Sequence, residues 1–154
     1  MIARIRKFLH DQRGSSALEF GLVAPLLFLM LAGFLEIGRA YVQAEAIEKG
    51  LRAGVLYSAR SGEPASEGVL GTAFNLVRTG TLDGAGPLLA SNWARPEARL
   101  TASFATAPVG QSSVPVVRFT AEVPFDPMVP GLVALAGVAG FTLTLSHEQA
   151  YVGR

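Results

Sequence analysis

The chain has 154 residues, of which 50% are hydrophobic and 16% are charged, so it is more apolar than an ordinary soluble domain of this size. It contains no cysteine, which excludes a disulfide framework and metal sites built on thiolates. The formal net charge is +1, and the basic cluster at the N-terminus is a short tail of Arg4, Arg6, Lys7 and Arg13. Nucleic-acid binding needs basic residues gathered on a folded face, so no nucleic-acid partner is expected.

An apolar run over residues 17–35 follows the basic tail. It contains one carboxylate in nineteen residues, and an α-helix needs roughly 20 apolar residues to cross a bilayer core of about 30 Å. We therefore predict a transmembrane helix over residues 15–36. Because the basic residues precede it, the positive-inside bias predicts a cytoplasmic N-terminus and an external C-terminal domain. A cleaved secretory signal fits less well, because its apolar region usually has only about 7–15 residues.

Two residues are unusual within this run. A carboxylate in a lipid-facing helix costs about 2.5–3.5 kcal/mol at the bilayer centre and less near its edge, so Glu19 either reaches back to the interface beside Arg13 or has a partner. Pro25 has no N–H and would leave the carbonyl of Gly21 without its helical partner. It is either a tolerated membrane proline or a functional bend in the helix.

The segment from Arg13 to Phe20 resembles the processing site of type IV prepilins, with a basic leader, a glycine, four residues, a glutamate, an aromatic residue and a long apolar run. The resemblance implies that a prepilin peptidase cleaves between Gly14 and Ser15 and that the apolar helix is kept. It also implies that Glu19 guides assembly. A carboxylate one turn from the new Ser15 ammonium, on its own helix or a neighbour's, would neutralise that ammonium in a low-dielectric setting.

Within that class, residues 13–60 resemble the TadE-like family of the tight-adherence (Tad) pilus system. The resemblance rests on Leu18-Glu19-Phe20, Ala24-Pro25-Leu26-Leu27 and Glu36-Ile37-Gly38-Arg39-Ala40. It implies a minor pseudopilin needed for assembly of a Tad-type (Flp, type IVc) pilus, anchored in the bacterial inner membrane with its domain in the periplasm. The implied partners are the prepilin peptidase, other pilin-like subunits, the inner-membrane assembly machinery and membrane lipid. TadG-like proteins are usually much longer, and a TadF-like role stays open.

The length allows one membrane segment and one small domain. We expect a leader over residues 1–14, the transmembrane helix over 15–36, a periplasmic extension of that helix over 37–60, and an α+β domain over 61–154. In the extension, one stripe at three- and four-residue spacing predicts a core face or, as the alternative, a partner-binding face. It is made of Ile37, Tyr41, Ala44, Ile47, Leu51 and Val55. Two i,i+4 ion pairs are also predicted, Glu45 with Lys49 and Glu48 with Arg52. The sequence Ser61-Gly62-Glu63-Pro64 predicts the end of the helix.

The outer domain is predicted to contain a short helix over residues 66–78, an irregular segment over 79–96 with one helical turn near 88–93, and strands over 99–105 and 114–123 joined by a loop. In the second strand, Val117, Phe119, Ala121 and Val123 alternate with other residues, which predicts one buried face. Residues 128–146 are apolar enough for a second membrane pass. The proline and glycines in this segment, and the alternation from Phe141 onward, favour a short turn or helix followed by a strand.

Signatures of catalysis are missing from the sequence. His147 has no second histidine at metal-ligand spacing, and no serine lies in a Gly-x-Ser-x-Gly elbow. We therefore expect no enzymatic activity, no catalytic residue, no metal, no cofactor and no small-molecule substrate. The alternative function is an uncleaved single-pass membrane-anchored periplasmic scaffold or binding module. The two functions make opposite predictions about cleavage after Gly14.

Overall fold

The computed structural model describes residues 13–110, 112–129, 131 and 141–151. In chain order the elements are α2 (Arg13–Arg60), α3 (Glu67–Thr79), the short 3-10 helix η1 (Ser91–Ala94), β1 (Arg99–Val109), β2 (Ser112–Phe125) and β3 (Phe141–Ala150). The strands form one antiparallel sheet in the order β1-β2-β3. A long apolar helix followed by a short helix and a small sheet is the α+β architecture predicted from the sequence.

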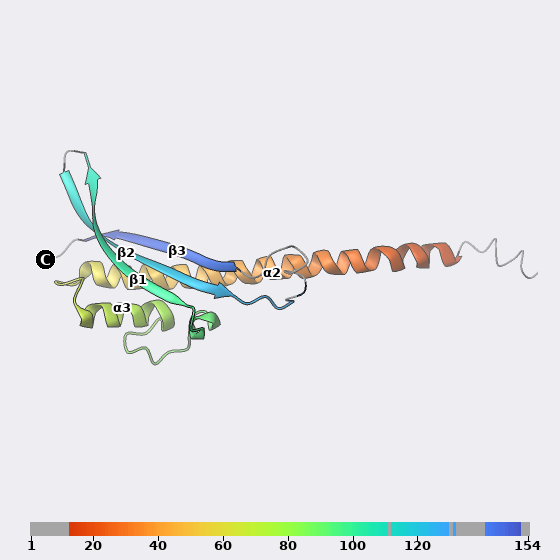
Figure 1. The fold of residues 1–154 in the computed structure, drawn as a ribbon, viewed down its shortest axis with the longest axis horizontal. Helices are drawn as coiled ribbons and strands as arrows, with labels where there is room; N and C mark the ends of the chain where they lie inside the picture. Colours follow the sequence, from red (N-terminus) through yellow and green to blue (C-terminus); the bar gives the residue numbers. More distant parts are fainter. Residues whose placement is uncertain (1–12, 111, 130, 132–140, 152–154) are drawn as a thin grey trace, which may run out of the picture.

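Helix α2 forms a rod on which the rest of the fold is built. Its 48 residues span about 72 Å at 1.5 Å per residue. The sheet and α3 pack around the C-terminal half of α2, whereas the N-terminal half extends away from them (Figure 1). We call residues 16–35 the bare segment, and we call the sheet, α3, η1 and the part of α2 that they cover the head.

The C-terminal end of α2 lies where the sequence predicts it. The backbone N–H of Ser61 donates to the carbonyl of Ser58 (3.1 Å). The hydroxyl of Ser58, which is fully buried, donates to the carbonyl of Pro64 (3.0 Å). These bonds satisfy polar groups at a helix end and turn the chain toward α3.

The buried face of α2 differs in part from the predicted stripe. Ile47, Leu51 and Val55 are fully buried as predicted, but Ile37 and Tyr41 are 68% and 65% exposed, so the prediction is wrong for the first turns. There the head covers a neighbouring line, which begins at the buried Glu36 and continues through the half-buried Ala40 and Gln43. The spacing of apolar residues predicted the wrong face of the helix here, because the face that the head covers begins with a carboxylate.

The outward face of α2 carries the two predicted ion pairs. Lys49 Nζ lies 3.6 Å from Glu45 Oε2, and Arg52 Nη2 lies 3.3 Å from Glu48 Oε1. All four side chains are substantially exposed, so each pair adds only a few tenths of a kcal/mol to helix stability, about 0.3–0.5.

Helix α3 packs against α2 at two glycines. A Cβ at Gly50 would lie 2.3 Å from the carbonyl oxygen of Val77, and a Cβ at Gly54 would lie 2.7 Å from that of Ala73. Ala73 and Val77 are fully buried. Glycine is therefore required at both positions for the backbones of the two helices to approach this closely.

The sheet lies on α2 and α3 with β2 at its centre. Val117, Phe119, Ala121 and Val123 are at most 1% exposed, which confirms the predicted buried face of the second strand. The ring of Phe119 meets that of Phe74 from α3 edge to face, with centroids 5.4 Å apart, a favoured aromatic arrangement. The core of the head thus joins the sheet to both helices.

The β1–β2 hairpin is longer than predicted. Pro108 pairs with Ser113 and Val109 with Ser112, so the ladder continues through most of the predicted loop. Gly110 has a φ of +64°, a value that glycine adopts without steric cost. The prediction of a loop was wrong because the proline, glycine and serines that indicate a turn also fit the end of a projecting two-stranded ribbon. Figure 1 shows this ribbon extending beyond the body of the head.

The last strand, β3, confirms the predicted strand after Phe141. It pairs antiparallel with β2 from Phe141↔Phe125 to Ala150↔Val116. The turn or helix expected before it, and the apolar stretch that raises a second membrane pass, lie largely at residues 130 and 132–140, outside the described residues. Residues 1–12 of the predicted leader, which spans 1–14, are outside the described residues too.

Candidate functional site

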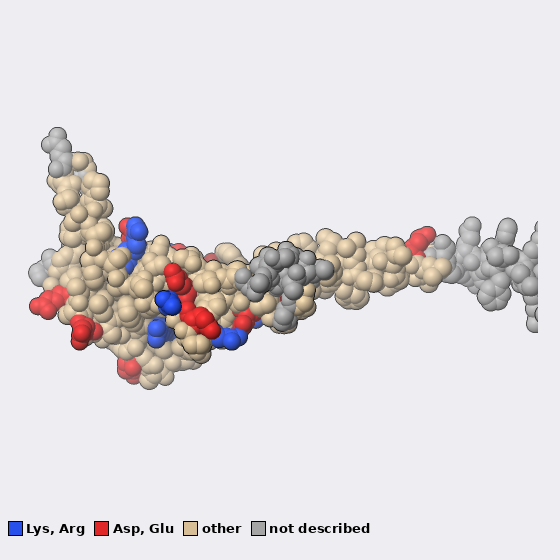
Figure 2. Space-filling model, in the orientation of Figure 1, with Lys and Arg blue, Asp and Glu red and all other residues tan. Residues whose placement is uncertain are grey.

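The bare segment exposes an apolar surface that the head does not cover. Leu22 is 82% exposed and Phe20 68%, and most of the large apolar side chains between residues 18 and 35 are exposed as well. In Figure 2 the charged residues gather on the head, and the visible face of the segment is almost free of them. Within the described residues, one helix is long and apolar enough to cross a membrane, and it contains this segment. Such a large exposed apolar surface marks a membrane or protein contact.

The residues singled out from the sequence lie along this end of α2. Gly14 and Ser15 are in its first turn, Glu19 and Phe20 are exposed one turn later, and α2 continues through Pro25 without interruption. Ser15 and Glu19 are four residues apart, which is about 6 Å along a helix axis. The structure thus places the predicted processing and assembly residues together, far from the head. The processing, the assembly role of Glu19 and the bend at Pro25 stay predictions.

A second polar group lies where the bare segment meets the head. The side chain of Glu36 is only 10% exposed, and both carboxylate oxygens have donors. The backbone N–H of Val129 donates to Oε1 (2.7 Å), and Arg39 Nη1 donates to Oε2 (3.1 Å). A carboxylate that accepts two such bonds is well satisfied despite its burial. Glu36 thereby ties the helix to a residue 93 positions later in the chain.

Aromatic contacts extend this connection into the sheet. The guanidinium carbon of Arg39 lies 5.7 Å from the ring centroid of Phe125, within the range of a cation–π interaction. The Phe125 ring stacks on that of Phe141, with centroids 4.7 Å apart and planes at 21°. The end of β2 and the start of β3 are therefore held against α2 at the same level. We call Glu36, Arg39, Phe125, Val129 and Phe141 the junction.

The role of the junction could not be read from the sequence. Glu36 and Arg39 form part of the motif that carries the family resemblance, but their spacing indicates only that they share a helix face. Their contacts with Phe125 and Val129 are long-range. The missed signal is a carboxylate immediately after a membrane-length apolar run, which needs a partner if the chain covers it. The junction fixes how the head sits on the helix, directly beside the apolar surface.

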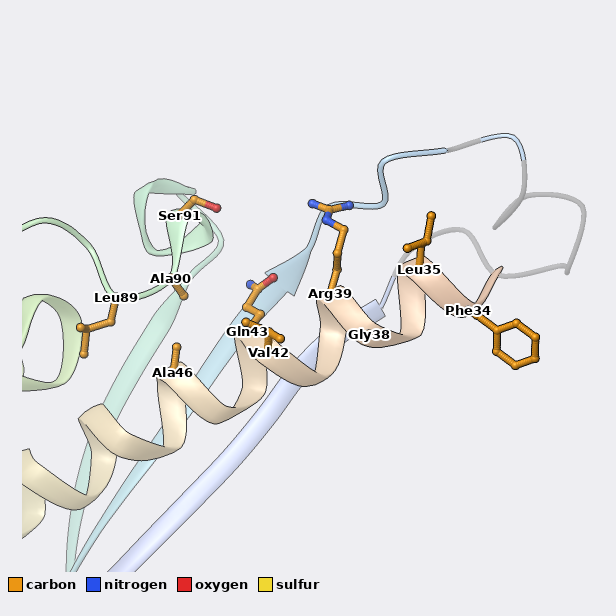
Figure 3. Close-up of a pocket in the computed structure, with 10 residues that line it drawn as sticks. All are labelled: Phe34, Leu35, Gly38, Arg39, Val42, Gln43, Ala46, Leu89, Ala90 and Ser91. Atoms are coloured by element: carbon orange, nitrogen blue, oxygen red, sulfur yellow. The ribbon is translucent and has the colours of Figure 1, made fainter. Parts of the chain in front are cut away.

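An open groove of about 540 Å³ lies beside the junction, between α2 and the loop before η1. Figure 3 shows Leu35, Arg39 and Gln43 projecting from one side of α2, and Phe34 pointing away from them. On the α2 side the wall consists of small and apolar residues together with Arg39 and Gln43, and on the other side of Leu89, Ala90 and Ser91. Most of the lining is apolar, which suits contact with apolar side chains.

The shifted pKa values have local causes away from the junction. The hydroxyl of Tyr41 donates to Glu45 Oε1 (2.9 Å), and this bond together with the charge of Glu45 raises the pKa of Tyr41. The backbone N–H of Ala85 donates to Asp83 and lowers the pKa of its carboxyl group. In the part of the chain that the structure describes, no group of His, Asp and Glu residues could hold a metal ion.

A helix that is apolar and bare over its first half, with a small α+β head on its second half, is consistent with a single-pass membrane-anchored protein. Residues 14–56 match the sequence model of TadE-like proteins. This match confirms the resemblance noted in the sequence and suggests involvement in a Tad pilus system. It covers most of α2, including Glu36 and Arg39, and none of α3 or the sheet. Searches of curated proteins and of solved structures gave no match.

Proposed function

We propose that this chain is a minor pseudopilin-like subunit needed for assembly of a Tad-type pilus. A prepilin peptidase removes residues 1–14, the bare segment anchors the subunit in the inner membrane, and the head lies in the periplasm. The observation that carries the proposal is the apolar surface of residues 16–35, which the head leaves uncovered and which lies within the family match. Other pilin-like helices would cover part of that surface, and the groove beside the junction would receive their apolar side chains.

The prepilin processing step is tested by the mass and N-terminal sequence of the membrane-extracted protein. We expect the mature chain to begin at Ser15, and we expect Gly14→Leu to block the cleavage because a bulky side chain would fill the space that glycine leaves for the peptidase. Gly21→Leu is the matched control, because a Cβ at Gly21 meets nothing within 4 Å, and it should be cleaved normally. A wild-type chain that begins at Met1 would support the alternative, an uncleaved membrane-anchored scaffold or binding module.

The assembly role of Glu19 is tested separately from processing. Glu19→Gln keeps the size of the side chain but removes the charge that would neutralise the Ser15 ammonium in a low-dielectric setting. We expect this variant to be cleaved and retained in the membrane, with most pilus formation lost, as counted by electron microscopy. Glu45→Gln, which removes a carboxylate from the exposed face of α2 in the head, should form pili normally. Full pilus formation by a processed Glu19→Gln subunit would show that this role is wrong.

A further inference from the structure

The outer edge of β1 presents backbone groups that have no backbone hydrogen-bond partner among the described residues. β1 lies at one side of the sheet, and within the described residues it pairs with β2 alone. The N–H of Tyr151 donates to the carbonyl of Pro115 (2.8 Å), so odd-numbered residues of β2 direct their backbone groups toward β3 and even-numbered ones toward β1. In the register Thr101↔Thr120, odd-numbered residues of β1 therefore face β2. The outward residues are Leu100, Ala102, Phe104 and Thr106.

This edge has few of the features that normally prevent strand association. Among the described residues, no backbone hydrogen bond to another element reaches its outward groups. The sequence contains no charged residue from 100 to 117, and Phe104 is 45% exposed. Exposed edges are usually protected by charges, prolines or bulges, and here the outward proline, Pro108, stands only at the end. Four consecutive outward positions thus remain able to pair with another strand.

The opposite side of the sheet offers a strand that runs in the matching direction. β1 and β3 are both antiparallel to β2, so they point the same way. By the same alternation, β3 directs the backbone groups of Thr142, Thr144, Ser146 and Glu148 outward, and no backbone hydrogen bond to another element reaches them within the described residues. If a second head joined this edge in the same orientation, its β3 would lie parallel to β1. Parallel strands can form an evenly spaced ladder.

Membrane anchoring selects this arrangement over a symmetric dimer. Antiparallel pairing of two β1 strands would turn the second head by about half a turn and reverse its α2 helix. Two chains anchored in one membrane must keep their α2 helices pointing in the same direction. This step rests on the anchoring in the proposed function. We propose that the outer edge of β1 pairs in parallel with the outer edge of β3 in a second copy of this chain. Each copy would then offer both edges, so that the heads associate side by side in an open row.

The absence of cysteine allows a direct crosslinking test in the membrane-embedded full chain. Ser103 of β1 and Ser146 or Thr144 of β3 are exposed, and their side chains share the sheet face opposite the core. Within one head β2 separates these positions by two strand spacings, about 9.5 Å, which exceeds the Cα separation of about 4.4–6.8 Å that a disulfide bridges. A disulfide in Ser103→Cys/Ser146→Cys or Ser103→Cys/Thr144→Cys must therefore join two chains.

We expect mild oxidation to convert at least one double variant into a ladder of dimers, trimers and larger species on a non-reducing gel. Each single variant should stay monomeric. A dimer from Ser103→Cys alone would indicate symmetric pairing and overturn the proposal, as would the absence of crosslinks from both double variants. The N-terminal mass of the same samples reports prepilin processing. A correctly processed chain that does not crosslink would therefore overturn the edge contact and leave the proposed function standing.

A second pair of variants tests whether the crosslink depends on the strand edge. Thr106 is exposed and its N–H points outward, so Thr106→Pro removes an edge donor without breaking a bond between β1 and β2. We expect it to lower the crosslinked fraction about two- to tenfold, the effect of losing one backbone hydrogen bond. Thr106→Val keeps the N–H and should crosslink like its parent. Equal crosslinking in both variants would show that the contact does not use this edge.

Discussion

Glu36 is a single residue that connects two distant parts of the described chain. Its carboxylate satisfies the Val129 N–H and the Arg39 guanidinium at once, in a place that is 8% exposed. Hydrogen bonds to charged groups stabilise a fold more than neutral ones. Val129 itself is 42% exposed, so water can partly replace the carboxylate as the acceptor of its N–H. Arg39 has a more exposed side chain, at 42%, so solvent screens its share of the interaction.

We therefore predict that Glu36→Ala loosens the junction more than Arg39→Ala does. Removal of the carboxylate takes away the acceptor of the Val129 N–H, which should lower the free energy of unfolding by about 0.5–1.5 kcal/mol, the net value of an ordinary hydrogen bond. Hydrogen exchange in detergent should show faster exchange in the peptide that contains Val129. Glu48→Ala, which removes an exposed carboxylate of the same helix, is the control. Unchanged exchange near Val129 in Glu36→Ala would contradict the assigned role.

The contact between the elements α2 and α3 depends on two positions of α2 that have no side chain. Gly50 and Gly54 lie one turn apart, and α3 fills the space above both of them. Alanine is favoured over glycine in a helix by about 0.8–1 kcal/mol, but overpacking a close contact costs about 1–3 kcal/mol. The second effect should win at Gly50, because the Val77 carbonyl that a methyl group would meet belongs to the backbone of α3.

We predict that Gly50→Ala lowers the thermal unfolding midpoint of the protein in detergent. Gly38→Ala is the matched control on the same helix, because a Cβ there meets nothing within 4 Å. Helix propensity should act alone at Gly38 and leave the midpoint equal or slightly higher. A midpoint for Gly50→Ala at or above that of the wild type would mean that α3 shifts away from α2 without cost.

Across the chain, the sequence was informative where the pattern is local. The period of two in β2 predicted its buried face, and the glycine- and proline-containing segment after Arg60 predicted the end of α2. The line covered on α2 and the junction could not be predicted, because both depend on how the sheet docks. Glu36 looks like a surface carboxylate until Val129 lies beside it. Likewise, the sequence indicates only that Gly50 and Gly54 lower helix propensity. Their role becomes clear when α3 is seen to pack against them.

The hydrogen bond between Glu36 and Val129 also has a consequence for the newly synthesised chain. Ribosomes add roughly 5–20 residues per second, so the 93 positions between these partners take on the order of 5–20 s to be made. During that interval the apolar anchor is already complete, whereas the inner line of α2 at Ile47, Leu51 and Val55 still waits for β2 and β3. The nascent subunit therefore exposes apolar surface before synthesis is complete, and this is the interval in which a chaperone could bind it.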